Sequence, residues 1–341
     1  MSDAPFEVPI MDPLGDKIPL FMPHVPKEGG RNIMDTLSSR WIGQGPKVDL
    51  FEARFSKELV SGANSVAVGS GTDALHLAYL LAGIGPGDEV LTPIFTCTAT
   101  NIPLLYCGAR PVFVDVEPNT LNFNVDDARS RVTDKTKAIV VVHYGGLPCN
   151  MTEVQALADE LGIPVIEDAA HALGAEYKGR AVGSISDYTM FSFQAIKHLT
   201  TGDGGMLTIK NPHTVPLANS LRWFGIDRPK KQAGIWENDI SEIGFKYQMT
   251  DISAALGLAG LDEFSWVLSH RQRLLDTYIQ EFTGFDAVSI LSRPQKESVH
   301  AAWLMTIAVE ERVGLQKKLW ENGIESNQVH YRNDRYSIFG E

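Results

Sequence analysis

The sequence predicts an α/β fold built on a mostly parallel sheet. Between about residues 65 and 209, short β-branched runs alternate with stretches that carry apolar residues at helical spacing, which is typical of βαβ units. Each connecting stretch is long enough to cross over to a parallel neighbouring strand. After Thr250 longer helical segments follow, which indicates a smaller domain. We therefore predict a three-layer αβα large domain with an N-terminal segment, residues 1–250, and a smaller α+β domain, residues 251–341.

The bounds of the individual elements follow from the β-branched runs and from the helical spacing of apolar residues. Apolar β-branched runs predict strands at 65–68, 89–92, 111–116, 137–142, 164–166, 187–193 and 206–210. Apolar residues recurring every three or four positions predict helices at 72–81, 99–106, 125–131 and 152–161. In the smaller domain we expect helical segments at 251–261, 263–282 and 314–322 and a strand at 302–309.

Composition excludes several classes of protein. The 30 Lys and Arg against 42 Asp and Glu leave a formal charge of −12, which disfavours non-specific binding to nucleic acid. Three cysteines, Cys97, Cys107 and Cys149, lack metal-finger spacing and favour a reducing compartment. The N-terminal residues lack the order of a secretory signal, and no apolar run reaches the roughly 20 residues of a membrane helix. We predict a cytoplasmic protein without a structural metal.

Residues 70–73 form a candidate phosphate site between a predicted strand and a predicted helix. Free backbone N–H groups and the helix dipole favour an anion there, Gly71 permits close approach, and the hydroxyl of Thr72 adds a donor. The alternative is that Ser70 or Thr72 only caps the helix. The segment matches neither a Walker loop nor a dinucleotide-binding fingerprint.

A second candidate follows the predicted strand at 164–166. In a parallel sheet the carboxyl ends of strands line the ligand crevice, so Asp168 would point toward a bound ligand. His171 lies three residues later, where its ring can donate a hydrogen bond to a neighbouring oxygen or stack on a ligand. Glu167, Asp168 and His171 could instead contribute to a metal site, but the sequence offers no second cluster of ligands for it. A further alternative is that Asp168 has only a structural role, with its carboxylate bonded to backbone N–H groups at the end of the strand.

A third candidate is Lys197, which follows a largely apolar strand and precedes a glycine-rich turn. Partial burial lowers the pKa of a lysine toward the range in which its neutral amine can form a Schiff base. Ser192, five residues earlier, lies within reach of the same anion as Thr72. A phosphate cradle, a strand-end aspartate and a loop lysine together match pyridoxal 5′-phosphate (PLP), which needs donors, a carboxylate and an amine.

The chain resembles the fold-type I, PLP-dependent sugar aminotransferases of the DegT/DnrJ/StrS family. The segments that carry the resemblance are 41–46, 69–75, 85–90, 167–172, 192–205, 249–252 and 330–331. The resemblance implies a PLP-transferase-like fold of the aspartate aminotransferase type. It makes Lys197 the Schiff-base lysine and proton carrier, pairs Asp168 with the pyridine nitrogen and puts His171 near the ring hydroxyl. It assigns the phosphate to Gly71, Thr72 and Ser192.

The resemblance also implies substrates and partners. Members typically aminate nucleotide-linked keto-sugars for amino-sugar and polysaccharide biosynthesis, commonly with L-glutamate as donor. They work as homodimers in which each site borrows residues from the neighbouring subunit. By position, Tyr144, His330 and Arg332 are candidate substrate contacts.

Three features depart from the family pattern. Cys97 stands where relatives often carry an aromatic residue that stacks on the cofactor, and Lys246 stands where many have an asparagine that reaches the partner's phosphate. Lysine can still act there as a point charge. The sequence reaches Glu341, whereas relatives usually continue through further elements of the small domain.

Other activities stay open from the sequence. A sister branch of the family performs 3-dehydration and carries histidine in place of the Schiff-base lysine; Lys197 argues against it, although His198 is adjacent. An aminotransferase acting on a cyclitol ketone and a catalytically idle regulatory or binding relative are further alternatives.

Overall fold

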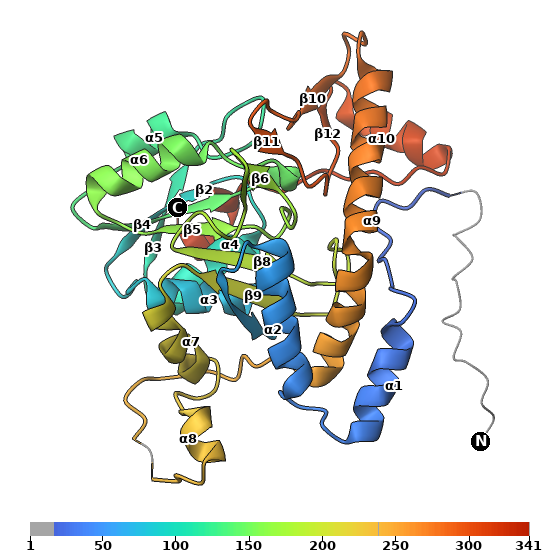
Figure 1. Ribbon diagram of the computed structural model, residues 1–341. Coiled ribbons are helices and arrows are strands. Elements are labelled where there is room, and N and C mark those ends of the chain that lie inside the picture. Colours follow the sequence, from blue (N-terminus) through green and yellow to red (C-terminus); the bar gives the residue numbers. More distant parts are fainter. Residues whose placement is uncertain (1–16, 238, 341) are drawn as a thin grey trace, which may run out of the picture.

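The computed structural model describes residues 17–237 and 239–340, and it is built around a seven-stranded sheet (Figure 1). The strands are β1 (Asn64–Val68), β2 (Glu89–Pro93), β3 (Arg110–Val114), β4 (Thr136–Val142), β5 (Val165–Asp168), β8 (Tyr188–Ser192) and β9 (Gly205–Ile209). Their order is β1-β9-β8-β5-β4-β2-β3, and β9 runs antiparallel to both of its neighbours. The other pairings within this sheet are parallel, which confirms the predicted mostly parallel α/β fold.

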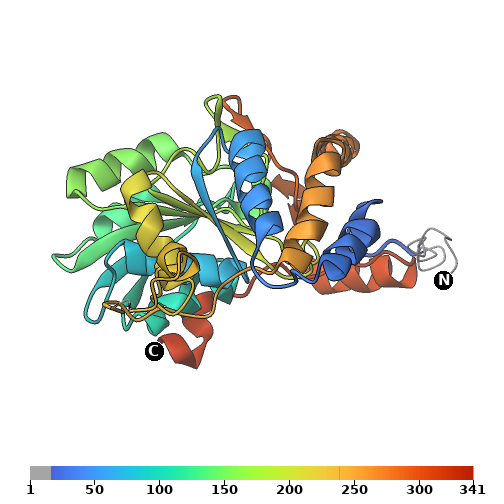
Figure 2. The same ribbon diagram turned by 60° about the horizontal axis from the view of Figure 1, so that its bottom comes forward.

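Helices cover both faces of the sheet. The α-helices of the described chain are α1 (Gly29–Ser39), α2 (Pro46–Leu59), α3 (Gly71–Leu81), α4 (Thr98–Tyr106), α5 (Val125–Ser130), α6 (Met151–Leu161), α7 (Val215–Leu221), α8 (Arg228–Gln232), α9 (Asp251–Phe282) and α10 (Arg312–Glu321), of which α1, α8 and α10 do not pack on the sheet. Because side chains alternate along a strand, Val140 packs toward α3 and α4 whereas Ile139 and Val141 pack toward α6. Figure 2 shows the sheet between the two helix layers, with α2, α6 and α9 on one side and α3 on the other.

Helix α9 joins the sheet layers to the C-terminal part of the chain. The two helical segments predicted at 251–261 and 263–282 are one continuous helix of 32 residues, which Thr250 caps by accepting a hydrogen bond from the N–H of Ser253. Its first half is buried in the cluster that contains Phe51 of α2 and Phe193 beyond β8. Its second half extends toward β10, β12 and α10 (Figure 1).

The C-terminal part contains short strands. β10 (Ser289–Leu291) pairs with β12 (Thr306–Ala308), and β11 (Ser298–Val299) pairs with β6 (Glu176–Tyr177), which in turn pairs with β7 (Arg180–Ala181). The strand predicted at 302–309 is therefore too long, because Ala302 adopts a positive φ of 55° and the segment before Thr306 is irregular.

The predicted division at residue 250 falls directly before α9, whose first half packs into the core of the sheet layers, and the division into two domains stays a prediction. Residues 1–16 of the expected N-terminal segment lie outside the described residues. They include most of the stretch that was predicted not to be a secretory signal. Within the described chain, no helix combines the length and apolar character needed to cross a membrane.

Candidate active site

A cavity of about 760 Å³ opens at the carboxyl ends of the parallel strands, where α/β sheets commonly bind ligands. It brings together eight of the residues selected from the sequence. These are Gly71, Thr72, Cys97, Asp168, His171, Ser192, Lys197 and His330. They come from α3, the start of α4, the ends of β5 and β8, the turn after β8 and the C-terminal segment, so residues distant in sequence share one site.

The N-terminus of α3 forms a cradle at one side of the cavity. Ser70 caps the helix, since its Oγ accepts a hydrogen bond of 3.0 Å from the N–H of Asp73. The capping alternative is thus correct for Ser70, and it leaves Gly71 and Thr72 facing the cavity. A Cβ at Gly71 would lie 3.1 Å from the Cβ of Ser192, so a larger residue would crowd the cradle. Backbone and hydroxyl donors at a helix N-terminus suit a phosphate.

Asp168 provides the carboxylate at the end of β5 and is 4% exposed. Its Oδ2 accepts a hydrogen bond of 2.7 Å from the hydroxyl of Thr100, and its Oδ1 accepts one of 3.1 Å from the N–H of Ala170. Burial raises the pKa of Asp168, although these hydrogen bonds and the charge of Lys197 oppose the rise. A protonated ring nitrogen beside this carboxylate would favour its ionised form.

Lys197 lies in the turn after β8 with its Nζ 3.8 Å from the ring centroid of Trp303. Burial lowers the pKa of Lys197 to about 8, although the nearby Asp168 and Cys97 favour the charged form. A substantial fraction of the amine is therefore neutral at mildly alkaline pH. This is the form that attacks a carbonyl or accepts a proton.

Two histidines stack beside this lysine. The ring of His171 lies 3.8 Å from that of Trp303 and 5.8 Å from that of His330, with interplanar angles of 15° and 11°. Burial and the charge of Lys197 lower the pKa of His171 well below its ordinary value and that of His330 to about 4, so both rings are neutral at physiological pH. The buried Nε2 of His330 has no hydrogen-bond partner within the described chain, which suits contact with a ligand.

Three predicted residues do not line the cavity. Tyr144 is fully buried and its hydroxyl pairs with Thr306 at 3.2 Å, while its ring packs edge-on against His171, so it supports the wall from behind. Arg332 is exposed, is not among the lining residues and pairs with Asp334 at 2.6 Å. Lys246 is exposed and donates to the side chain of Gln248. The structure therefore does not support direct contact of Tyr144 or Arg332 with a substrate in this chain's cavity.

The donor set of the cavity fits PLP. The cradle provides donors for a phosphate, the buried carboxylate of Asp168 suits a pyridinium nitrogen, and Lys197 offers an amine with a lowered pKa. Within the described residues, no group of three His, Cys, Asp or Glu side chains is arranged to hold a metal ion.

Comparison with known proteins agrees with this geometry. The model of the DegT/DnrJ/EryC1/StrS aminotransferase family matches residues 24–338. The chain belongs to this family. It is 38% identical over 304 residues to the spore coat polysaccharide biosynthesis protein SpsC of Bacillus subtilis, an alignment that covers 86% of this chain and 76% of SpsC.

Solved structures of the family superpose closely on the chain. The sugar aminotransferase CalS13 from Micromonospora echinospora has a TM-score of 0.89 at 32% identity, covering 94% of this chain and 88% of CalS13. The PMP-form of Spr1654 from Streptococcus pneumoniae, described as a putative sugar aminotransferase, gives the same TM-score, identity and coverage, and its PLP-form has a TM-score of 0.88. The protein is thus a PLP-dependent sugar aminotransferase of the DegT/DnrJ/EryC1/StrS family.

Sequence reasoning missed several residues that support the site. Thr100, which bonds Asp168, and Trp303, which contacts Lys197, were not selected. Thr96 precedes α4 and Thr100 lies in its first turn, with their hydroxyls 2.9 Å apart, and two threonines four residues apart across a helix start are a signal that could have identified Thr100. Nothing in the local sequence marks Trp303.

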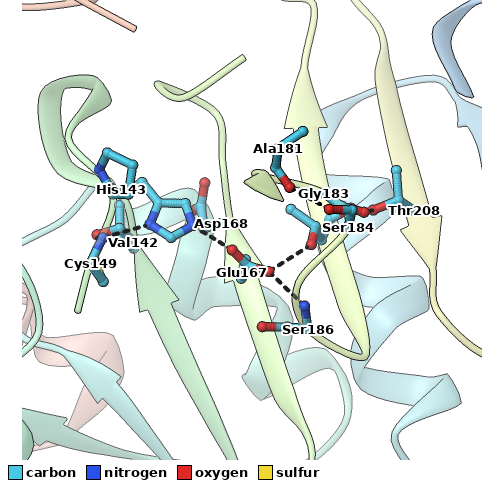
Figure 3. Close-up of polar contacts among 12 residues, drawn as sticks. Val142, His143, Cys149, Glu167, Asp168, Ala181, Gly183, Ser184, Ser186 and Thr208 are labelled. Carbon is cyan, nitrogen blue, oxygen red and sulfur yellow. Dashed lines mark hydrogen bonds and ion pairs between the residues drawn. The ribbon is translucent and has the colours of Figure 1, made fainter. Parts of the chain in front are cut away.

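A buried cluster behind Asp168 was also missed (Figure 3). Glu167 accepts three hydrogen bonds: 2.7 Å from His143, 3.0 Å from the N–H of Ser186 and 3.1 Å from the hydroxyl of Thr189. Although burial opposes ionisation, His143 and the other donors hold the pKa of Glu167 below its usual range. Nδ1 of His143 accepts from the N–H of Cys149 at 3.0 Å, so its Nε2 carries the proton donated to Glu167. The cluster ties β4, β5 and β8 together beside the cavity.

Proposed function

We propose that this aminotransferase transfers an amino group from L-glutamate to a nucleotide-linked keto-sugar. The observation that carries the proposal is the convergence of Lys197, Asp168 and the cradle at Thr72 on one cavity. The cavity also extends along the C-terminal segment, where Asn327 and Gln328 line it. These amides can donate and accept hydrogen bonds, which suits a ligand rich in hydroxyl groups. The family's activity on sugars supports this assignment.

The roles of the residues follow from the chemistry of amino transfer. PLP supplies, when bound, an aldehyde that condenses with amines and a protonated ring that withdraws electrons. Asp168 would keep the proton on the ring nitrogen, and Gly71, Thr72 and Ser192 would hold the phosphate. Lys197 would accept at Nζ the proton removed from the amino donor and return it on the other side of the transferred nitrogen. The neutral His171 would stay close to the ring without adding a charge.

We also propose that the enzyme is a cytoplasmic homodimer with shared active sites. Lys246 supports sharing, because it is exposed and lies outside this chain's cavity, where a second subunit could be reached if its hydrogen bond to Gln248 were exchanged. The three cysteines, which are free in the structure, fit a reducing compartment. An active monomer in sedimentation or light-scattering measurements would contradict sharing.

Substrate choice is tested by one panel assay. The purified enzyme is supplied with L-glutamate and, in turn, UDP-, TDP- and GDP-linked keto-sugars and an inosose, and the aminated product is detected by mass spectrometry. We expect turnover of a nucleotide-linked keto-sugar with release of 2-oxoglutarate. Turnover of the inosose alone would instead assign a cyclitol aminotransferase, and failure with every acceptor and donor would favour a regulatory relative.

The role of Lys197 is tested separately by borohydride reduction of the PLP-loaded enzyme followed by peptide mapping. We expect the cofactor to be fixed on Lys197 and Lys197→Ala to lose amino transfer, whereas Lys210→Ala, which replaces an exposed lysine just after β9, retains it. Full transfer by Lys197→Ala would refute the assignment.

A further inference from the structure

The indole of Trp303 is held against the lysine of the active site. It belongs to the irregular segment between β11 and β12, more than 100 residues beyond Lys197, and is 7% exposed. The Nζ of Lys197 lies 3.8 Å from its ring centroid. The indole N–H donates a hydrogen bond of 3.3 Å to the carbonyl of Ile196. The indole is therefore bonded to the residue directly before the lysine whose amine it contacts.

Neighbouring rings fix the orientation of this indole. His171 stacks on it at a centroid distance of 3.8 Å and an interplanar angle of 15°, and Phe21 stacks at 5.6 Å and 27°. Because His171 is neutral, it does not compete with the ammonium of Lys197 for the negative potential of the indole face. With both rings packed against it, Trp303 cannot turn away without breaking several contacts.

The other groups around Lys197 leave a role for the indole. Asp168 and Cys97 lie near enough to favour the ammonium form, while burial disfavours it. His198 and His330 also lie close, but burial keeps both neutral, so neither repels the ammonium. Among the described residues, Nζ makes no hydrogen bond or ion pair, and its contact with the Trp303 ring lies at 3.8 Å from the centroid.

We propose that Trp303 is a positioning residue for Lys197, whose π face holds the protonated amine whenever it is not bonded to the cofactor. Tryptophan is the strongest aromatic partner for a cation, and the interaction gains strength where water is excluded. A π face accepts the ammonium without fixing any one N–H direction. The amine can therefore carry a proton and still turn to deliver it. This proposal rests on the aminotransferase activity and not on which sugar is aminated.

The test measures the free amine of Lys197 directly. In enzyme loaded with pyridoxamine phosphate the lysine is not bonded to the cofactor, so competitive labelling with acetic anhydride across a pH series, read by mass spectrometry, gives its pKa. From the typical strength of a partly desolvated cation–π contact, Trp303→Leu should lower this pKa by about one. Trp303→Phe should lower it by about 0.3 because phenylalanine keeps a weaker π face.

A control and two outcomes make the test decisive. Trp266→Leu removes an exposed indole on α9, which stacks on His270, and should leave the pKa of Lys197 unchanged. An unchanged or raised pKa in Trp303→Leu would overturn the proposal, since a rise would show that the indole acts only by excluding water. If Trp303→Leu does not fold, Trp303→Phe decides alone: a lowered pKa supports the proposal and any other result overturns it.

Discussion

Replacing Thr100 by valine should weaken cofactor binding without reshaping the cavity. Valine has nearly the same shape as threonine, so the change removes mainly the hydroxyl that donates to Asp168 Oδ2 at 2.7 Å. A hydrogen bond to a charged, buried group contributes about 1.5–3 kcal/mol. Because this bond favours the ionised carboxylate, its loss should raise the pKa of Asp168 further. The carboxylate would then bind a protonated ring nitrogen less well, and PLP affinity should fall roughly 10- to 100-fold.

The same substitution has a second, structural cost that must be separated from the first. Thr96 loses the hydroxyl with which it pairs at 2.9 Å, and it is 2% exposed, so stability should fall by about 1 kcal/mol. Thr208→Val is a matched control, because the Thr208 hydroxyl is equally buried and bonds backbone carbonyls, including that of Gly183, and not Asp168.

The assay is a titration of the apo-protein with PLP at pH 8, followed by visible absorbance, together with urea unfolding of each variant. Thr100→Val should lose both cofactor affinity and stability, whereas Thr208→Val should lose stability alone. PLP affinity within twofold of the parent in Thr100→Val would refute the reasoning that this hydroxyl keeps Asp168 ionised.

Three further outcomes are expected. Glu167→Gln should lower the free energy of unfolding at pH 7 by about 1–3 kcal/mol, because the new amide NH2 would face one of the buried donors that the carboxylate accepts from. Since the pKa of Glu167 is lowered in the folded protein, this contribution is lost as pH falls below the usual range of a glutamate, so the urea midpoints of variant and parent should converge in acid. Asn333→Ala removes two hydrogen bonds, with Asn101 and with the carbonyl of Thr96, that anchor the cavity-lining segment 327–331. Steady-state assays should show KM for the keto-sugar raised about tenfold, while PLP affinity stays unchanged. The donor half-reaction, followed by stopped-flow absorbance, should accelerate with pH through about 8 as Lys197 loses its proton; a rate that falls over this range would contradict a free-base role.

The sequence predicted the parts of the site that local chain geometry determines. Asp168 follows a buried strand and Thr72 opens a helix, so the sheet's topology alone brings them to one edge. Trp303 could not be found in this way, because its position depends on packing between segments more than 100 residues apart. Tyr144 and Arg332 were predicted as substrate contacts from their positions along the chain, but backbone position does not tell what a side chain bonds, and they pair with Thr306 and Asp334.

The neighbouring acids Glu167 and Asp168 show how strand geometry assigns different roles to similar side chains. Because successive side chains on β5 point to opposite faces, only Asp168 can face the cavity, and Glu167 must be buried on the other side. A buried carboxylate is costly unless donors surround it, and His143 with the donors of Ser186 and Thr189 supplies three. The backbone N–H of His143 also bonds the carbonyl of Asp168 at 3.2 Å. The cluster that satisfies Glu167 therefore also fixes the backbone of Asp168, so a shift of one residue in the register of β5 would disable both acids.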